Sequence, residues 1–281
     1  MNKENIKIVV CCHKECAYPK DEIYLTIQAG KAVSNVELKM HGDNEGENIS
    51  SKNHDFCELT AIYWAWKNIK KLYPSTEYVG LAHYRRYLTV NKKPVSTVVH
   101  EQLSFTKQVF KLIFRHNFRF FLNQNMLYTN DKNLDKALAK TNNWYVKQIN
   151  RNPETIFTTK PLKLYGLCVR DGTLFENSKE RLNYVEQVIK SDWKEYSAAF
   201  DKALSAYENC YANMFVMPVK EFDEYCSFMF DVLFKVENHF DGKYDKELRE
   251  TGYLGELLTN IYLVKKQDEI SIKYMNGLFV R

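Results

Sequence analysis

Basic side chains are concentrated in one stretch of the sequence. Residues 78–130 carry eight Lys or Arg residues and a single acid, Glu101, whereas the rest of the chain has a slight acidic excess. Two of these bases, Arg85 and Arg86, follow a predicted strand at 78–82, and ligands of open α/β sheets bind at the carboxyl ends of strands. Guanidinium groups fork onto phosphate oxygens and keep their charge. The cluster therefore indicates a local anionic partner, either a diphosphate or a lipid surface.

A second predicted strand also ends in side chains that could do chemistry. Residues 6–12 are mostly apolar and β-branched, which is typical of a buried strand, and Cys12 and His13 stand at its end. Cys and His are standard zinc ligands, and Cys16 lies nearby, but this spacing matches no structural zinc site. We therefore expect buried strand cysteines, with His13 facing a nucleotide pocket.

A polar loop at 41–53 is a candidate binding surface. It is rich in turn-forming residues and offers donors and acceptors suited to ribose or sugar hydroxyls and to phosphate. These side chains are Asp43, Asn44, Asn48, Ser50 and Lys52. The same residue types build turns without touching a ligand, and Asn53 can cap the helix that follows, so both interpretations stay open.

Composition and periodicity bound the fold. The chain has 281 residues, 45% hydrophobic and 27% charged, which is globular and excludes disordered or fibrous classes. Seven cysteines form no Cys-x-x-Cys pair, which favours a reducing cytoplasm. No stretch reaches the roughly 18 apolar residues of a membrane span, and the first residues lack the hydrophobic region of a signal peptide.

The predicted elements alternate between strands and helices. Strands are expected at 6–12, 36–40, 78–82, 210–217 and 269–274, and helices at 53–73, 107–122, 179–190, 192–207, 219–236 and 250–265. No element can be placed between 123 and 171. This order predicts an α/β fold with a mixed, largely parallel sheet flanked by helices and a helical C-terminal half.

The helix predicted at 107–122 is basic and amphipathic. Lys107, Lys111, Arg115 and Arg119 are spaced four apart on one arc, with Phe114 near its edge. Such a helix can lie on an anionic membrane, where each basic residue contributes about 1 kcal/mol. It can equally pack its apolar side on the protein core, so both interpretations stay open.

Several motifs together resemble a known bacterial family. They are CCHK at 11–14, GDNEGENISSKN at 42–53, ELTAIYWAWKN at 58–68, YVGLAHYRRYL at 78–88, NMFVM at 213–217, EFDEYCSFMFDVLFKVE at 221–237 and GYLGELLTNIYL at 252–263. This order resembles a family of capsular and exopolysaccharide synthesis whose members look like nucleotide-sugar glycosyltransferases. The sequence departs from the family's pattern at 123–171 and at Leu257, where an Arg is expected.

The resemblance implies a GT-A-like fold and a division of labour along the chain. Residues 1–281 would form one glycosyltransferase domain, with a nucleotide-sugar-binding half at 1–100, a basic amphipathic insertion at 101–130 and an acceptor-side half at 170–281. The implied donor is a nucleoside diphosphate sugar, UDP-linked, and the implied acceptor is a lipid-linked glycan at the inner face of the plasma membrane. Some family members are associated with galactofuranosyl transfer. Nucleic acid is not expected as a partner, since no RNP or KH pattern is present.

The resemblance, together with the residue chemistry described above, suggests roles for individual residues. Glu256 is the first candidate for the catalytic base, with Asp43 and His83 as rivals. The donor or diphosphate site would include Cys12, His13, Asp43, Asn44, Asn48, Ser50, Lys52, His83, Tyr84, Arg85 and Arg86. Asn213 and Met214 would line the acceptor side, and Lys107, Lys111, Phe114, Arg115 and Arg119 would touch the membrane.

Metal use is the remaining question for such an enzyme. Many nucleotide-sugar transferases hold Mg²⁺ or Mn²⁺ with an Asp-x-Asp pair, but this sequence has none, and Asp43-Asn-Glu45 is a weak substitute. We therefore predict that Arg85 and Arg86 replace the metal and that no cofactor is required, without excluding Mg²⁺ or Mn²⁺. The alternative function is a non-catalytic glycan- or lipid-binding module that keeps the fold.

Overall fold

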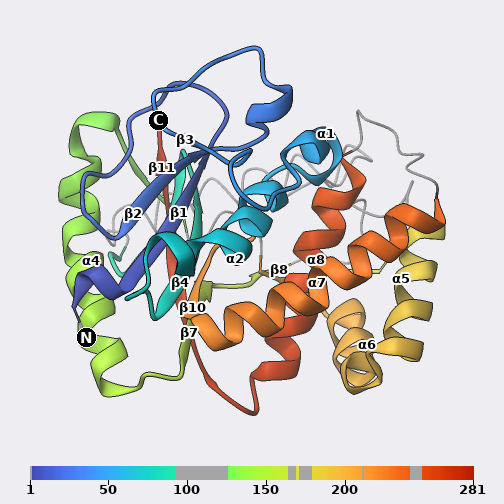
Figure 1. The fold of residues 1–281 in the computed structure, drawn as a ribbon. Helices are drawn as coiled ribbons and strands as arrows, with labels where there is room; N and C mark the ends of the chain where they lie inside the picture. Colours follow the sequence, from blue (N-terminus) through green and yellow to red (C-terminus); the bar gives the residue numbers. More distant parts are fainter. Residues whose placement is uncertain (1, 93–125, 164–168, 171–178, 211, 241–248) are drawn as a thin grey trace, which may run out of the picture.

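The computed structural model describes residues 2–92, 126–163, 169–170, 179–210, 212–240 and 249–281 (Figure 1). The predicted basic helix at 107–122 lies outside these residues, so the membrane-contact prediction stays a prediction. Its residues are Lys107, Lys111, Phe114, Arg115 and Arg119.

The N-terminal part forms the parallel portion of the sheet. Its strands are β1 (Ile6–Cys12), β2 (Tyr24–Gln28), β3 (His41–Gly42) and β4 (Tyr78–His83), which lie in the order β4-β1-β2-β3. Cys11 pairs with His83, and Cys12 pairs with Gln28, so these strands end at one edge. Side chains at the ends of β1 and β4 are thereby brought together.

The remaining strands of this sheet make it mixed. They are β5 (Arg86–Thr89), β6 (Met126–Thr129), β7 (Thr155–Thr159), β10 (Phe215–Pro218) and β11 (Ser271–Val280). Successive pairings of β4, β5, β11, β7 and β10 return to β4, and four of these five pairings are antiparallel. The sheet is therefore mixed, as predicted, but beyond the first four strands it is not largely parallel, since among the described strands only the pairings of β11 with β6 and β7 are parallel there. A separate pair, β8 (Leu162–Lys163) and β9 (Glu208–Asn209), lies apart from this sheet.

Gly80 shows why a glycine occupies the middle of β4. A Cβ there would lie 2.7 Å from the backbone oxygen of Phe215 and 2.7 Å from a methyl group of Val216. Both contacts belong to β10, which pairs with β4 on the side opposite β1. The close approach of β10 therefore excludes a side chain at this position.

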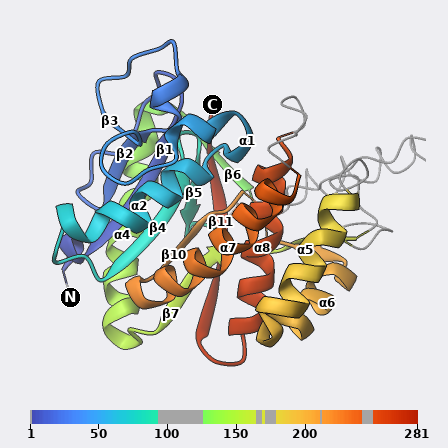
Figure 2. The ribbon, with the colours of Figure 1, turned by 45° about the vertical axis from the view of Figure 1, so that its right-hand side comes forward.

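Helices cover both faces of the sheet (Figures 1 and 2). α4 (Leu134–Arg151) packs with Ile8, Val10 and Cys12, whereas the other helices share a core with Val9 and Cys11. That second group is α1 (Asn53–Phe56), α2 (Leu59–Leu72), α5 (Lys179–Asp192), α6 (Ser197–Ser205), α7 (Val219–His239) and α8 (Glu250–Lys266). Successive residues of β1 therefore serve opposite cores, as the strand period requires.

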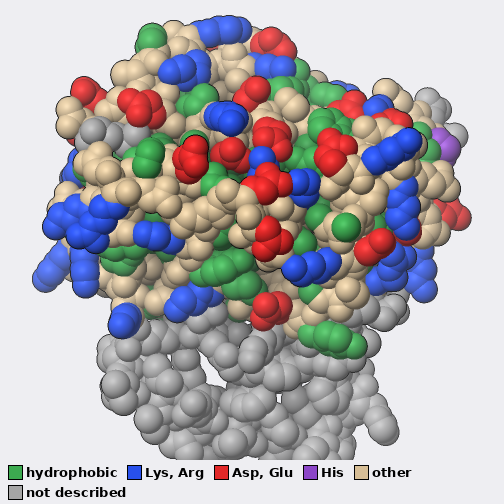
Figure 3. Space-filling view, turned by 90° about the horizontal axis from the view of Figure 1, so that it is seen from below, with side chains coloured by type: hydrophobic (Ala, Val, Ile, Leu, Met, Phe, Trp, Pro, Cys, Tyr) green, Lys and Arg blue, Asp and Glu red, His purple; other side chains and the backbone are tan. Residues whose placement is uncertain are grey.

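The described surface has the features of a protein face exposed to water. None of the helices that the structure describes is long and apolar enough to cross a bilayer. Acidic and basic side chains are interspersed on the face shown in Figure 3. Such mixing is typical of a surface that faces water.

Most of the predicted helices and strands exist, but three regions differ from the prediction. The helix predicted at 53–73 is interrupted at Cys57, whose φ of 52° ends α1 before α2 begins. The strand predicted at 36–40 was wrong, because backbone groups of this segment form hydrogen bonds with the Gln28 side chain and not with a neighbouring strand. It donates to the Val36 carbonyl at 2.5 Å and accepts from the Leu38 amide at 2.9 Å. The stretch 123–171, where no element was predicted, holds α4 and β7.

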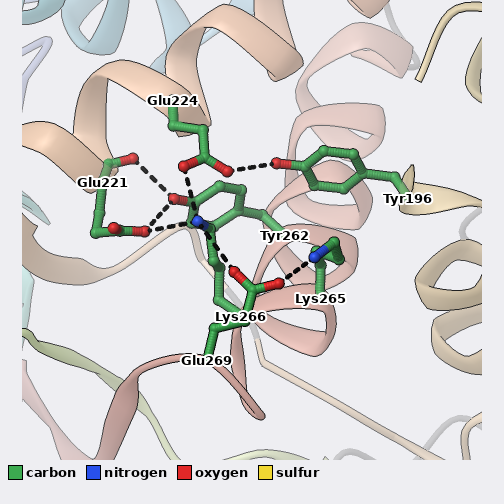
Figure 4. A network of polar contacts seen from close by, with 7 residues as sticks. All are labelled: Tyr196, Glu221, Glu224, Tyr262, Lys265, Lys266 and Glu269. Atoms are coloured by element: carbon green, nitrogen blue, oxygen red, sulfur yellow. Dashed lines mark hydrogen bonds and ion pairs between the residues drawn. The ribbon is translucent and has the colours of Figure 1, made fainter. Parts of the chain in front are cut away.

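An ionic network joins the helices of the C-terminal half (Figure 4). The Lys266 side chain is only 8% exposed, and its Nζ lies 2.7 Å from a Glu224 oxygen and 3.2 Å from a Glu221 oxygen. Tyr262 donates to Glu221, and Tyr196 donates to Glu224. Since Glu221 and Glu224 lie on α7 and Lys266 on α8, the network fixes how these two helices pack.

Lys266→Ala should lower the free energy of unfolding by about 2–4 kcal/mol, because it leaves the buried Glu221 carboxylate without its cation. Urea unfolding measures the change. Lys265→Ala is the matched control, since Lys265 pairs with the exposed Glu269 and such pairs contribute about 0–1 kcal/mol. Equal losses in the two variants would contradict this account of the network.

Candidate active site

A cavity of about 1030 Å³ opens where β1 and β4 end. Six segments supply its walls: the end of β1, the residue after β2, the region where α1 meets α2, the β4–β5 turn, the start of α8 and the end of β11. The lining residues are Cys11, His13, Ala29, Asn53, His54, Cys57, Glu58, His83, Tyr84, Arg85, Arg86, Arg249, Gly252, Tyr253, Glu256, Phe279, Val280 and Arg281. The volume matches that of sites for drug-sized ligands.

The β4–β5 turn places Arg85 and Arg86 at the cavity. The Tyr84 amide donates to the Cys11 carbonyl at 3.0 Å, and the Arg85 carbonyl accepts from the Val280 amide at 3.0 Å. The guanidinium of Arg86 lies 5.3 Å from the ring centroid of Phe279. Both arginines therefore stand on backbone that the sheet holds firmly.

Two more arginines complete a basic cluster. The Nε atom of Arg249 donates to the Cys57 sulfur at 2.9 Å, and the Arg281 guanidinium lies 3.7 Å from the Tyr128 ring centroid. With Arg85 and Arg86, these four guanidinium groups are solvent-exposed, and none has a carboxylate ion-pair partner among the described residues. We call Arg85, Arg86, Arg249 and Arg281 the arginine cluster. It is suited to an anion with several oxygens.

Two carboxylates lie in the same cavity. Burial, and then the negative charge of Glu58, raises the pKa of Glu256 to about 7. A Glu58 oxygen accepts from the Asn213 amide at 2.9 Å, and the Asn213 oxygen accepts from the Thr259 hydroxyl at 2.8 Å. Glu58 is thus oriented by Asn213, which precedes β10, and through it by Thr259 on α8. Glu256 can gain or lose a proton near neutral pH.

His83 is held beside these carboxylates. Its Nε2 atom donates to the Ala212 carbonyl at 2.5 Å, which leaves Nδ1 as the acceptor of the neutral ring. Burial lowers the pKa of His83, although the charge of Glu58 opposes this effect. The ring is therefore neutral at physiological pH.

The start of α8 is packed tightly against α1 and α2. The Asp55 carboxylate accepts from the Thr251 amide at 3.2 Å and from the Thr251 hydroxyl. A Cβ on Gly255 would lie 2.7 Å from a Leu59 methyl group, so any larger residue would require the Leu59 side chain to shift. A buried ion pair of 2.6 Å between Arg181 and Glu250 anchors the same turn. These contacts bring Arg249 and Glu256 to the cavity.

The chain was compared with known protein families, curated proteins and solved structures. The model of a family described as "Domain of unknown function (DUF4422)" matches residues 7–267. The chain belongs to this family. Its structure is similar to that of the WbbM bifunctional glycosyltransferase in the apo state, with a TM-score of 0.77 and 26% sequence identity over 98% of this chain. The chain spans 45% of that protein's chain, less than half its length. No curated protein matches the sequence.

In this DUF4422 chain, six of the fourteen residues predicted for the catalytic, donor and acceptor sites meet at one place. His13, His83, Tyr84, Arg85, Arg86 and Glu256 all line the cavity. His13 packs edge-on against Tyr84, with ring centroids 4.8 Å apart. The strand-end argument therefore located the cavity from both β1 and β4.

In the loop at 41–53, the side chains predicted to bind the donor do not line the cavity, and several of them form internal hydrogen bonds. Asp43 is buried and accepts from the Gly30 amide at 2.8 Å, the Lys31 amide at 3.1 Å and the Ser50 hydroxyl at 2.5 Å. The cavity lining includes none of Asp43, Asn44, Asn48, Ser50 and Lys52. Asp43 thus organises the turn after β2, which corrects its assignment as a rival catalytic base.

The other loop side chains have partners of their own. The Asn48 amide donates to the Asn44 and Gly46 carbonyls at 3.1 and 2.8 Å, and Lys52 pairs with Glu237 at 2.6 Å. Asn44 is exposed outside the cavity lining. The turn-building interpretation of this loop therefore accounts for its contacts.

Three further residues predicted for the site lie next to the cavity lining but do not form part of it. Cys12 faces the core under α4, and its neighbour Cys11 lines the cavity, because alternate strand residues face opposite sides. Asn213 lies behind the lining and orients Glu58. Met214 is buried in the core and does not line the cavity.

Sequence reasoning missed Glu58, Tyr253, Arg249 and Arg281. Arg249 and Arg281 are distant in sequence from the HYRRY segment, so only the tertiary fold joins them to it. Glu58 starts the helical pattern of α2 and resembles any residue of a first turn. Among the described residues, no three His, Cys, Asp or Glu side chains are grouped to hold a metal ion.

Proposed function

We propose that this chain is a glycosyltransferase that moves a sugar from a nucleoside diphosphate donor, UDP-linked, to a lipid-linked glycan during cell-surface polysaccharide synthesis. The observation that carries the proposal is that the arginine cluster and the Glu256 carboxyl line the same cavity. The similarity to a bifunctional glycosyltransferase supports the reaction class. Galactofuranosyl transfer and a membrane-peripheral location remain the finer expectations from the family resemblance.

The residues suggest a division of roles in such a transfer. The Glu256 carboxylate takes the proton of an acceptor hydroxyl, the hydroxyl oxygen bonds to the anomeric carbon, and the bond from that carbon to the diphosphate breaks. Negative charge then grows on the leaving diphosphate, where fixed guanidinium groups stabilise it. In this proposal the arginine cluster takes the place of a metal ion.

The alternative of a non-catalytic glycan- or lipid-binding module has a structural signature. In such a module His83, Arg85 and Arg86 would be held by internal pairs away from any cavity. Instead all three line the cavity, and Arg85 and Arg86 are exposed to its solvent. The geometry therefore favours the transferase over the binding module.

Calorimetric titration with UDP, GDP and CMP, each in EDTA and again in Mn²⁺, tests the proposal. We expect selective UDP binding that EDTA does not weaken, because the arginine cluster supplies the positive charge. Binding that requires Mn²⁺ would contradict the replacement of the metal by arginine. Binding of no nucleotide under either condition would favour the non-catalytic module.

A further inference from the structure

Two cysteines stand side by side at the end of β1. The sulfur atoms of Cys12 and Cys16 lie 3.9 Å apart, whereas a disulfide bond needs about 2.05 Å. Cys12 is fully buried and Cys16 is partly exposed. An oxidant can therefore reach Cys16 from solvent, and Cys12 is within reach as its partner.

The surroundings of Cys16 favour its thiolate. The contact with the Cys12 thiol lowers the pKa of Cys16, and the positive charges of Arg85 and Lys14 lower it further, against the opposing effects of burial and Asp131. The thiolate is the form of cysteine that attacks oxidants. Cys12 shows the reverse: the contact with Cys16, and then burial, raises its pKa. Cys16 is thus the attacking thiol and Cys12 the resolving one.

We propose that Cys12 and Cys16 form a peroxide-sensitive thiol pair whose closure to a disulfide regulates the nucleotide cavity. The Cys16 thiolate attacks one oxygen of hydrogen peroxide, the O–O bond breaks, and a sulfenic acid and one water form. The Cys12 sulfur then bonds to the Cys16 sulfur and displaces the hydroxyl group as a second water. Two thiols and one peroxide give one disulfide and two waters, and a dithiol reductant reverses the change.

The link to the cavity is His13, which lies inside the five-residue loop that the disulfide would close. The His13 ring lines the cavity and packs against Tyr84, and the Lys14 amine lies 5.3 Å from the centroid of that same tyrosine ring. Cys12 is fixed by β1, so the approach of the two sulfurs must move residues 13–16. The regulatory part of the inference rests on the proposed nucleotide site; the thiol chemistry does not.

Oxidation with hydrogen peroxide, followed by alkylation and mass spectrometry, tests the pair. We expect a loss of 2 Da, explained by two hydrogen atoms, and a peptide map that joins Cys12 to Cys16. Cys16→Ser should not show this product. Cys210→Ser is the control, since Cys210 is buried elsewhere and serine can keep its hydrogen bond to the Thr159 carbonyl. Absence of the disulfide, or a bond from Cys16 to another cysteine, would overturn the pair.

UDP titration of the same samples tests the regulation. Oxidation should weaken UDP binding about tenfold, which corresponds to one lost hydrogen bond, and a dithiol reductant should restore it. Cys16→Ser should bind UDP equally before and after peroxide. Unchanged UDP affinity in the disulfide form would overturn the coupling to His13. Failure of the reduced protein to bind UDP would instead contradict the proposed function and leave the mapped disulfide standing.

Discussion

Replacing Glu256 with Gln should lower the rate of sugar transfer by about 10²–10⁴-fold, the usual contribution of a general base. The amide keeps the shape of the side chain but cannot take a proton from the acceptor. UDP affinity should not fall, because the substitution removes a negative charge from the neighbourhood of the arginine cluster. UDP release from the best donor of a UDP-sugar panel measures the rate, and calorimetry measures the affinity.

The matched control for this substitution is Glu186→Gln. Glu186 is a carboxylate on α5 whose partners, Lys190 and Arg170, lie outside the cavity lining. Its removal should leave both the rate and the UDP affinity unchanged. A Glu256→Gln enzyme that keeps full activity would remove Glu256 from the mechanism and direct attention to His83.

The pH dependence of kcat/KM distinguishes a catalytic role of Glu256 from a purely structural one. Only the ionised carboxylate accepts a proton, so kcat/KM should rise with pH and level off above the Glu256 pKa of about 7. Glu58 raises that pKa through its negative charge, so Glu58→Gln should move the rising limb to lower pH. A limb that stays in place would mean that another group controls it.

The parts of this site that sequence could locate are those that local pattern determines. A β-branched run such as 6–12 predicts a buried strand, and parallel strands deliver His13 and His83 to one edge. The period of two also separates Cys11 from Cys12, but which cysteine faces the cavity depends on which helices cover each face. That choice is made by tertiary packing, which assigns Cys12 to the core under α4.

Other parts depend on contacts across large sequence separations. Arg249 reaches the cavity because the Asp55 carboxylate accepts a hydrogen bond from the Thr251 amide at the start of α8. Gly252 and Gly255 also let α8 approach α1 and α2 closely. No local sequence pattern at these positions indicates that Arg249 lies at the same cavity as Arg85. The ring of pairings through β5, β11, β7 and β10 was likewise hidden, since strand direction is set by connections such as α4. The buried face of α4 includes the polar side chains of Thr141, Asn142 and Gln148, which weaken its apolar signal in the sequence.

Removing one guanidinium from the arginine cluster should weaken UDP binding by about 10–100-fold, equivalent to about 1.5–3 kcal/mol for a charge-assisted hydrogen bond. Arg85→Ala and Arg249→Ala are the informative variants, because these residues line the cavity from two segments that are far apart in the sequence. Uridine lacks the diphosphate, so its affinity should not change. Arg170→Ala, an exposed arginine paired with Glu186, controls for the loss of a surface charge.

Two further comparisons decide whether the arginines act on the diphosphate directly. Arg249→Lys keeps the charge but loses the fork, so it should recover only part of the affinity lost in Arg249→Ala. If Arg85 and Arg249 hold the same diphosphate, the double Ala variant should depart from additivity, whereas independent sites would add within about 0.5 kcal/mol. Unchanged UDP affinity in both single variants would defeat the replacement of metal by arginine. Equal losses for uridine and UDP would mean that the arginines shape the cavity without binding phosphate.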